Sequence, residues 1–256
     1  MMDSIILAGG FAKRMLPLTK NIPKQLLDVG GKPILQHVIE SLGNVAPDRI
    51  IISVNSFFAS KFQNFIDNYK GTMNLQLYIE PSLSEEEKLG ALGALHLLFK
   101  DLEIEGPVFI AGGDNLSDFD LKRMVTMAQN TGRDVIGLYD VEDIELAKLY
   151  GIAQQDGDRI SDFVEKPLAP PSTLVATAYW LLSKSGISHF LDYIESGGDR
   201  DAMGNFLAWN VRRHDVRSVV FRGTWYDVGG LESYNDAQKW LSDYLRVFFR
   251  TVLSQL

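Results

Sequence analysis

The feature that most constrains the fold of this chain is a regular alternation of apolar runs and helical stretches through residue 140. The apolar runs are typical of short strands: Ile5–Ala8, Arg49–Val54, Leu75–Ile79, Val108–Ala111 and Asp134–Tyr139. Between them, apolar residues recur at helical spacing over Pro33–Leu42, Phe57–Tyr69, Gly90–Phe99 and Leu121–Gln129. Repeated strand–helix–strand order implies right-handed crossovers, so we predict an α/β fold with a mostly parallel sheet flanked by helices.

The later chain is less regular. A turn at Asp156–Asp158 separates Ile152–Gln155 from Arg159–Val164 and predicts a hairpin. Further strands are expected at Leu174–Leu182 and Val216–Phe221, with a helix at Ile187–Ile194. We expect one domain over residues 1–230 and a helical extension over 231–256, which either packs on that domain or forms an interface between copies. The extension's apolar residues follow three- and four-residue steps: Tyr234, Ala237, Leu241, Tyr244, Leu245, Phe248 and Val252.

Composition excludes several classes of function. A net charge of -8 argues against a nucleic-acid or anionic-membrane partner, because either would require a basic face. The absence of cysteine excludes disulfides, thiolate metal sites and a cysteine nucleophile. The apolar run after Met1–Ser4 is too short for a signal peptide, and no stretch approaches the ~20 apolar residues of a membrane span. We therefore expect a cytoplasmic protein.

A glycine-rich loop follows the first strand. Gly9 and Gly10 allow the backbone to approach a polyphosphate closely with its N–H groups pointing inward. Arg14 can then bind phosphate oxygens bidentately, and Lys24 adds a second cation. The spacing matches neither a P-loop nor a dinucleotide-binding fingerprint. The alternative is an ordinary glycine turn with solvated basic residues.

Acidic residues follow three of the later strands. Asp114 comes directly after Val108–Ala111, where a carboxylate is well placed to hold Mg²⁺ while phosphates fill its other positions. Asp227, in a glycine-rich turn, can hold the same ion. Glu165 and Lys166 can meet a sugar hydroxyl and a phosphate. The alternatives are turn or capping aspartates and a surface ion pair before Pro167. His37, His96, His189 and His214 have no metal-ligand spacing, so we expect no zinc site.

Leu7–Thr19, followed by Pro23–Leu27, resembles the signature loop of the sugar-1-phosphate nucleotidylyltransferases, which include glucose-1-phosphate thymidylyl- and uridylyltransferases and mannose-1-phosphate guanylyltransferases. The resemblance spans Ser4 to Tyr234. It implies the nucleotide-diphospho-sugar transferase fold, a Rossmann-like sheet of the GT-A type. Further segments agree in the family's order: Leu89–Leu95, Gly113–Asn115, Tyr150–Ile152, Phe163–Pro167, Asp201–Phe206 and Trp225–Gly229.

The resemblance implies a reaction in which an NTP and a sugar 1-phosphate give an NDP-sugar and pyrophosphate, with Mg²⁺ as cofactor. Glucose 1-phosphate with UTP or dTTP is the expected pair. The implied roles are catalysis by Arg14, Lys24 and Lys166, nucleotide binding by Leu7, Gly9, Gly10 and Gly90, sugar-phosphate binding by Gly151, Glu165 and Lys166, and Mg²⁺ binding by Asp114 and Asp227.

The sequence departs from the family pattern at several positions. Ala12 and Lys13 replace the usual Gly and Thr or Ser, and Gly93 stands where thymidylyl-specific members carry a base-reading Gln. Ala178 replaces a usual Gly, so one wall of the sugar pocket differs. Two other functions stay open: a catalytically silent relative that binds nucleotide or sugar phosphate to regulate another protein, and a GT-A glycosyltransferase. The second normally carries Asp-x-Asp, which Asp114–Leu116 does not match.

Overall fold

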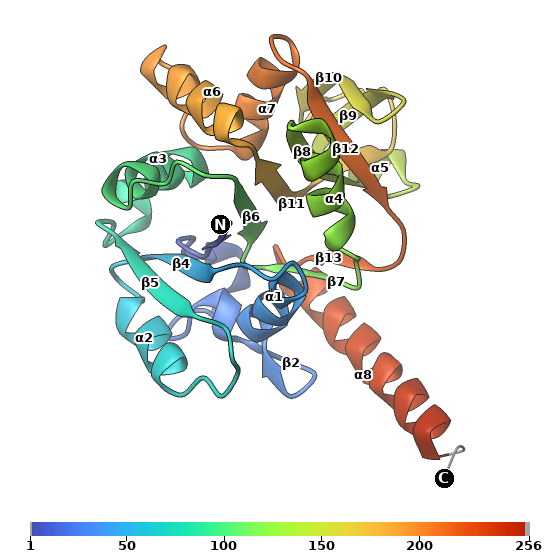
Figure 1. Ribbon diagram of the computed structural model, residues 1–256. Helices are drawn as coiled ribbons and strands as arrows, with labels where there is room; N and C mark the ends of the chain where they lie inside the picture. Colours follow the sequence, from blue (N-terminus) through green and yellow to red (C-terminus); the bar gives the residue numbers. More distant parts are fainter. Residues whose placement is uncertain (1, 254–256) are drawn as a thin grey trace.

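A mixed sheet of nine strands forms the body of the protein (Figure 1). The computed structural model describes the backbone of residues 2–253 and the side chains of residues 2–242. The strand order is β5-β4-β1-β6-β11-β8-β12-β10-β9. Their bounds are β1 Asp3–Leu7, β4 Arg49–Asn55, β5 Leu75–Glu80, β6 Val108–Gly112, β8 Asp134–Asp140, β9 Gly151–Asp156, β10 Arg159–Glu165, β11 Leu174–Leu182 and β12 Val216–Phe221. The pairings show that β10 and β11 run antiparallel to the other seven strands, which all share one direction. The predicted mostly parallel sheet is therefore confirmed.

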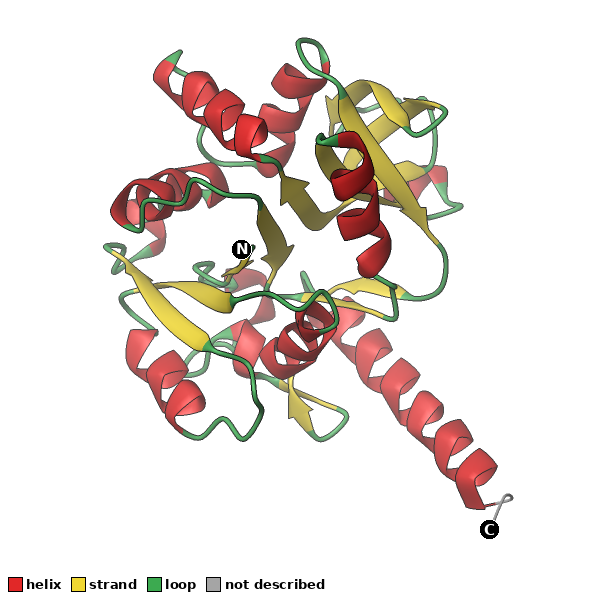
Figure 2. Ribbon diagram, in the orientation of Figure 1, coloured by secondary structure: helices red, strands yellow, loops and turns green. Residues whose placement is uncertain are grey.

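Helices cover both faces of the parallel strands (Figure 2). Ile5 and Ile51 face a core shared with the helices α3, α6 and α7, whereas their neighbours Ile6, Ile50 and Ile52 face α1, α2 and α4. This two-sided burial explains why β4 is a continuous apolar run. The helices are α1 Ile34–Gly43, α2 Ala59–Asp67, α3 Ala91–Asp101, α4 Lys122–Thr131, α5 Ile144–Ala147, α6 Lys184–Glu195 and α7 Met203–Val211.

The second half of the sheet curls back on itself. Strand β9 pairs with β10 as the predicted hairpin, and it also pairs with β11 through Ile152 and Val175. The five strands β11, β8, β12, β10 and β9 therefore form a partly closed barrel. This closure brings the start of β9 and the end of β10 next to β11. A separate ribbon, β7 Asn115–Ser117 with β13 Trp225–Asp227, and the short pair β2 Asp28–Val29 and β3 Lys32–Pro33 complete the strands of the described chain.

The longer predicted elements match the structure within a few residues, but several short ones were not predicted. Helix α7 lies in a segment noted only for its resemblance to the family, and β7 and β13 are too short for a period of two to be visible. Each depends on contacts with distant parts of the chain. In α7, Phe206 packs against Phe190 of α6 with ring centroids 5.4 Å apart.

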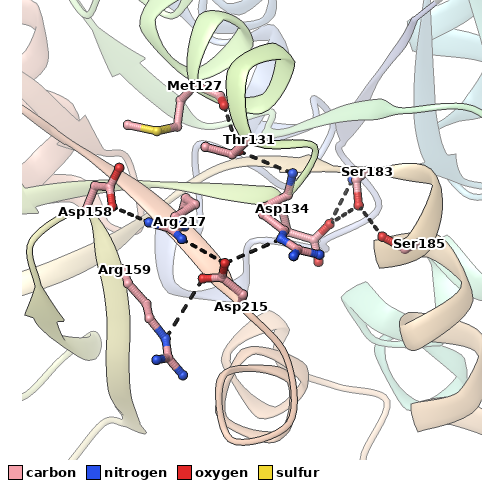
Figure 3. Close-up of polar contacts among 10 residues, drawn as sticks. Met127, Thr131, Asp134, Asp158, Arg159, Ser183, Ser185, Asp215 and Arg217 are labelled. Atoms are coloured by element: carbon pink, nitrogen blue, oxygen red, sulfur yellow. Dashed lines mark hydrogen bonds and ion pairs between the residues drawn. The ribbon is translucent and has the colours of Figure 1, made fainter.

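A polar cluster lies at the amino ends of β8 and β12 (Figure 3). Asp134 is 4% exposed and accepts hydrogen bonds from Ser183 N–H at 2.8 Å, Ser183 Oγ at 2.7 Å and Asn210 Nδ2 at 3.0 Å. Arg217 donates to Asp158 at 2.6 Å and to Asp215 at 2.8 Å. We call Asp134, Asp158, Ser183, Asn210, Asp215 and Arg217 the amino-edge cluster. Each of its aspartates accepts a hydrogen bond from a protein group, and its arginine donates to two carboxylates.

The last helix, α8 Leu231–Leu253, begins on the body and then projects away from it (Figure 1). Tyr234, Ala237 and Leu241 pack against a small core around Met15 and Val29. The predicted apolar stripe continues through Tyr244, Leu245, Phe248 and Val252, whose side chains lie outside the described residues. Over the described chain, no helix has the length and apolar character needed to cross a membrane.

Candidate active site

Two neighbouring cavities open where β1, β5 and β6 end. The glycine-loop cavity has a volume of about 300 Å³ and is lined by Leu7, Gly9, Gly10, Ala12, Lys24, Gln25, Glu80, Gly90, Asp114 and Asp201, among others. The hairpin cavity, of about 270 Å³, is lined by residues that include Leu7, Tyr150, Gly151, Glu165, Lys166, Ala178, Trp225 and Asp227. Leu7 lines both cavities, so the two are adjacent. Two ligands bound in them would meet beside Leu7.

The glycine-loop cavity owes its shape to close backbone approaches. Asn55, at the end of β4, donates from Nδ2 to the carbonyl of Gly9 at 2.8 Å and fixes the loop to the sheet. Gly90 begins α3 with a φ of +73°, and a Cβ there would lie 2.4 Å from the carbonyl oxygen of Arg200. Only glycine fits this left-handed, crowded position. The cavity is therefore walled by backbone on two sides, as the glycine pattern predicts.

Asp114 lies between the two cavities and is held by three neighbours. Its Oδ2 accepts from Lys24 Nζ at 2.6 Å, its Oδ1 accepts from Asn115 Nδ2 at 3.0 Å, and its carbonyl accepts from Val228 N–H at 3.0 Å. Lys24 is buried on a short 3-10 helix, Lys24–Leu26. Lys24 and Asp114, which were predicted from separate segments of the chain, thus form an ion pair.

The β7–β13 ribbon brings the second predicted carboxylate to the same place. In the ribbon, Asp227 lies opposite Asn115, and Asn115 is the residue that follows Asp114 in the sequence. Trp225 Nε1–H donates to Asn115 Oδ1 at 2.7 Å and locks the ribbon. Burial, and then the negative charge of Asp114, raise the pKa of Asp227 to about 6, against the opposing effect of Lys24 and Arg14. Two carboxylates therefore lie close enough to influence each other in a buried setting, and Lys24, Arg14 and Lys166 offset this effect only in part.

The hairpin cavity is built around Glu165 and Gly151. A Cβ on Gly151 would lie 2.7 Å from Glu165 Oε2 and 2.1 Å from Phe163 Cζ, so the glycine makes room for both side chains. Burial raises the pKa of Glu165, whereas nearby Lys166 lowers it. Lys166 Nζ lies 3.8 Å from Glu165 Oε1, and its φ of +44° is unusual for a residue with a side chain. Backbone strain of this kind often marks a functional site.

Of the residues proposed from the sequence, Arg14 alone lies outside the linings of these two cavities. Arg14 lies in the short 3-10 helix Lys13–Met15, with its side chain exposed. Its charge still reaches the site, because it lowers the pKa of Asp227.

Comparison with known proteins adds to this geometry. The family model of the nucleotidyl transferases matches residues 3–243. The chain belongs to the nucleotidyl transferase family. Mannose-1-phosphate guanylyltransferase 1 of Arabidopsis thaliana is 27% identical over 253 residues, which cover 96% of this chain and 66% of that protein. The catalytic subunit beta of mannose-1-phosphate guanylyltransferase from Xenopus tropicalis is 28% identical over 232 residues, 89% of this chain and 61% of that protein.

The chain thus spans about two-thirds or less of the length of these relatives. Among solved structures, UDP-glucose pyrophosphorylase complexed with UDP-glucose superposes with a TM-score of 0.80 at 22% identity, over 95% of this chain and 99% of that one. At that identity the superposition supports the fold, and it agrees with the predicted nucleotide-diphospho-sugar transferase architecture.

The donor set of this nucleotidyl transferase family member fits a magnesium ion. Mg²⁺ prefers one or two carboxylates and keeps its other positions for water and phosphates. Asp114 and Asp227 supply two carboxylates, and burial, followed by the charge of Asp114, raises the pKa of Asp227. In residues 2–242 no three His, Cys, Asp or Glu side chains gather as a complete metal cage. The pair therefore suits an ion that arrives with phosphate ligands.

Sequence reasoning missed three residues of the site. Glu80 lines the glycine-loop cavity and is 5% exposed, and Gln25 beside it is 3% exposed. Tyr150 lines the hairpin cavity, where burial and then the charges of Asp227 and Asp114 raise its pKa to about 12. Glu80 ends a predicted strand, and this position at the carboxyl edge was the available signal. Gln25 and Tyr150 lie in Pro23–Leu27 and Tyr150–Ile152, and the resemblance of these two segments to the family was the available signal.

Proposed function

We propose that the protein is a sugar-1-phosphate nucleotidylyltransferase, which joins an NTP and a sugar 1-phosphate to give an NDP-sugar and pyrophosphate. The observation that carries the proposal is the pair of cavities that meet at Leu7, with Lys24, Asp114 and Asp227 at their junction. A triphosphate in the glycine-loop cavity and a sugar phosphate in the hairpin cavity would place their reacting phosphates there. The family membership supports the same reaction.

The chemistry needs little from the protein beyond positioning and charge. An oxygen of the sugar phosphate attacks the α-phosphorus in line, a new P–O bond forms, and the bond from the α-phosphorus to the bridging oxygen breaks as pyrophosphate leaves. The attacking phosphate is already an anion at pH 7, so no general base is required. Holding the two reactants in line supplies much of the rate enhancement.

Each basic residue then neutralises one phosphate. Lys166, next to Glu165 in the hairpin cavity, binds the phosphate of the sugar 1-phosphate, while Glu165 accepts from a sugar hydroxyl. Lys24 stabilises charge at the α-phosphate, and Arg14, whose charge acts on Asp227, stabilises the pyrophosphate leaving group. Gly9, Gly10 and Gly90 bring backbone against the nucleotide, and Gly151 makes room for the sugar.

Asp114 and Asp227 are the proposed ligands of Mg²⁺. When bound, the ion neutralises the triphosphate and orients its α-phosphate. Lys24 already donates to Asp114, so this lysine keeps that carboxylate in position.

Pyrophosphate release tests the proposal. The purified protein is given Mg²⁺ and a grid of common NTPs and sugar 1-phosphates. Three pairs have priority. Glucose 1-phosphate with UTP and with dTTP are expected from the sequence, and mannose 1-phosphate with GTP is suggested by the names of the relatives. Release that requires both substrates is expected. No release from a folded protein that still binds nucleotide would favour the regulatory alternative instead.

The glycosyltransferase alternative has a separate readout. A GT-A glycosyltransferase would consume an NDP-sugar and release a nucleoside diphosphate, without pyrophosphate. Leu116 further argues against it, because it stands where the second aspartate of an Asp-x-Asp motif would be and its apolar side chain cannot bind a metal.

A further inference from the structure

The β7–β13 ribbon carries both proposed magnesium ligands, and few contacts attach it to the main sheet. Asp114 directly precedes β7, and Asp227 is the last residue of β13. In the described part of the chain the ribbon is a separate sheet, with no ladder of backbone hydrogen bonds to the nine strands. Within residues 2–242, Tyr179 is the one residue of the nine-stranded sheet whose side chain hydrogen-bonds to β7 or β13. This side chain therefore helps to set where the two carboxylates lie.

Tyr179 lies in β11, with its ring in the core and its hydroxyl at the ribbon. The residue is 0% exposed, and its ring packs edge to face against Phe119 with centroids 6.2 Å apart. Its hydroxyl oxygen lies 3.1 Å from the carbonyl oxygen of Asn115 and 3.0 Å from Ser117 Oγ. A phenol has one proton and a carbonyl can only accept, so Tyr179 donates to Asn115 and Ser117 donates to Tyr179. One hydroxyl thus holds both ends of β7.

Asn115 connects this hydroxyl to both carboxylates. Its backbone is held by Tyr179, while its side-chain Nδ2 donates to Asp114 Oδ1 at 3.0 Å. Its Oδ1 accepts from Trp225 Nε1 at 2.7 Å, and in the ribbon it lies opposite Asp227. A shift of Asn115 away from the main sheet would therefore move the two aspartates relative to the strands that line the cavities.

Packing of the ring does not explain the hydroxyl of Tyr179. A buried hydroxyl is costly unless it is hydrogen-bonded, and phenylalanine would fill the same space without that cost. The backbone of Tyr179 is already fixed by its pairing with Ala111 of β6. Burial raises the pKa of Tyr179 to about 12, helped by the charge of Asp114 and opposed by Ser117, so the group is a donor at neutral pH. The bonds to β7 are the contacts that require this hydroxyl.

We propose that Tyr179 is a positioning residue for the magnesium site: its hydroxyl fixes β7 where Asp114 and Asp227 can bind one ion together. The inference rests on the proposed function to the extent that these two aspartates are taken as the metal ligands. Two carboxylates bind an ion more tightly when their spacing is set beforehand, because no binding energy is then lost in ordering them. Without the hydroxyl both ligands remain, but the ribbon that carries them is held less firmly.

Metal binding tests this without depending on catalysis. Mn²⁺, whose free concentration is measured by its EPR signal, is titrated into the unaltered protein and into Tyr179→Phe, Asp114→Asn and Asp227→Asn, all without nucleotide. Tyr179→Phe is expected to weaken the Kd for Mn²⁺ about tenfold, as loss of a group that orients metal ligands typically does. The two aspartate variants, which each lose a ligand, should weaken it more.

Pyrophosphate release gives a second readout. At limiting Mg²⁺, Tyr179→Phe should release pyrophosphate about tenfold more slowly than the unaltered protein. Raising the Mg²⁺ concentration should recover most of that rate, because both ligands are still present, whereas Asp114→Asn should not recover. The KM for the sugar 1-phosphate should stay unchanged in Tyr179→Phe. A rate that excess Mg²⁺ leaves equally low would contradict the positioning role.

Matched variants keep the result interpretable. Tyr78→Phe removes a tyrosine hydroxyl from β5, four strands away from β11, where it donates to Asp101 Oδ2 at 2.7 Å. Its Kd for Mn²⁺ should equal that of the unaltered protein. Ser117→Ala removes one of the two bonds to the Tyr179 hydroxyl and keeps the other, so it should weaken the Kd about threefold. It is the informative variant if Tyr179→Phe fails to fold.

The outcomes separate this inference from the proposed function. An unchanged Kd for Mn²⁺ in Tyr179→Phe, with or without a lower melting temperature, overturns the role of Tyr179 even if pyrophosphate is released. A weaker Kd in Tyr179→Phe, without pyrophosphate release from any substrate pair, supports Tyr179 and overturns the reaction. Mn²⁺ that binds Asp114→Asn and Asp227→Asn as tightly as the unaltered protein overturns the metal site, and the inference with it.

Discussion

Asp134 and Asp114 lie at opposite edges of one sheet, and their surroundings differ. Asp134, at the amino edge, accepts a hydrogen bond from Asn210 and two from Ser183. Figure 3 shows the two from Ser183, and it shows Arg217 nearby, which is shared between two aspartates. Asp114, at the carboxyl edge, has Lys24 but also the second carboxylate of Asp227, whose pKa is raised to about 6. Every charged group of the first cluster has a partner within the protein, although Asn210 Oδ1, Asp215 Oδ1 and Arg217 Nε are buried there without a hydrogen-bond partner. In the second, two carboxylates lie close together, and under the proposed function a cation and phosphates would complete the site.

This difference has an energetic meaning. Hydrogen-bonded charges at the amino edge stabilise the fold, because removing one partner leaves another buried and unpaired. At the carboxyl edge, burial and the nearby charge of Asp114 make the ionised form of Asp227 costly, and under the proposed function a bound cation would offset that cost. Substitutions at the carboxyl edge should therefore lower activity more than stability, and substitutions at the amino edge should lower stability more than activity. Four predictions follow from this comparison and from the backbone of the glycine loop.

The largest effect is expected on activity at the carboxyl edge. Asp114→Asn should lower pyrophosphate release a hundred- to a thousandfold, as loss of one charge contact at a transition state typically does. Its melting temperature should change little. Asp120→Asn, at an exposed aspartate after β7, is the control and should retain full activity. Equal activity in both variants would remove Asp114 from the site.

The amino edge should show the reverse. Asp134→Ala leaves Ser183 and Asn210 without their acceptor, so the free energy of unfolding in urea should fall by about 3 kcal/mol. Below its melting temperature the variant should keep its kcat/KM. Lys148→Ala, which removes only the exposed ion pair with Glu145, should cost less than about 0.5 kcal/mol. A loss of activity without a loss of stability in Asp134→Ala would contradict the comparison.

The third prediction concerns pH. The pKa of Asp227 is about 6 in the folded protein and about 4 for an unfolded aspartate, so the folded state binds the proton more tightly. Its contribution to the unfolding free energy therefore falls as the pH rises from about 4 to about 6 and stays low above that. Asp227→Asn should then be more stable than the unaltered protein by about 2 kcal/mol at pH 7, measured with EDTA.

That advantage should vanish near pH 4 and shrink when Mg²⁺ is added at pH 7, since the ion neutralises the carboxylates only in the unaltered protein. A difference in stability that is the same at pH 4 and pH 7 would mean that the charge of Asp227 carries no cost.

The smallest effect concerns the backbone of the glycine loop. Ala12 has φ 49° and ψ 41°, a left-handed conformation that costs a residue with a side chain about 1 kcal/mol relative to glycine. Ala12→Gly should raise the unfolding free energy by about 0.5 kcal/mol after the entropy of glycine is subtracted. The reverse substitution, Gly132→Ala at φ +67° far from the site, should lower it by about 1 kcal/mol. A destabilised Ala12→Gly would show that the loop is not strained.

The long elements could be predicted because their pattern is local. A run such as Arg49–Asn55 encodes burial on both faces in its own residues, and α1 shows its apolar face within ten residues. The short ribbon β7–β13 could not be predicted, because Trp225 finds Asn115 only when residues 110 positions apart are brought together. Helix α7 likewise depends on packing against α6.

By itself the sequence determined the α/β class, the glycine loop with its two cations, and the residue types of the site, since these follow from periodicity, turn chemistry and motifs over a few neighbouring residues. The tertiary structure decided that Lys24 pairs with Asp114, that Asp227 lies beside them, and that Glu80 lines the glycine-loop cavity. The physical reason is that charge pairing, burial and the resulting pKa shifts depend on distances through space, and strand order alone sets those distances.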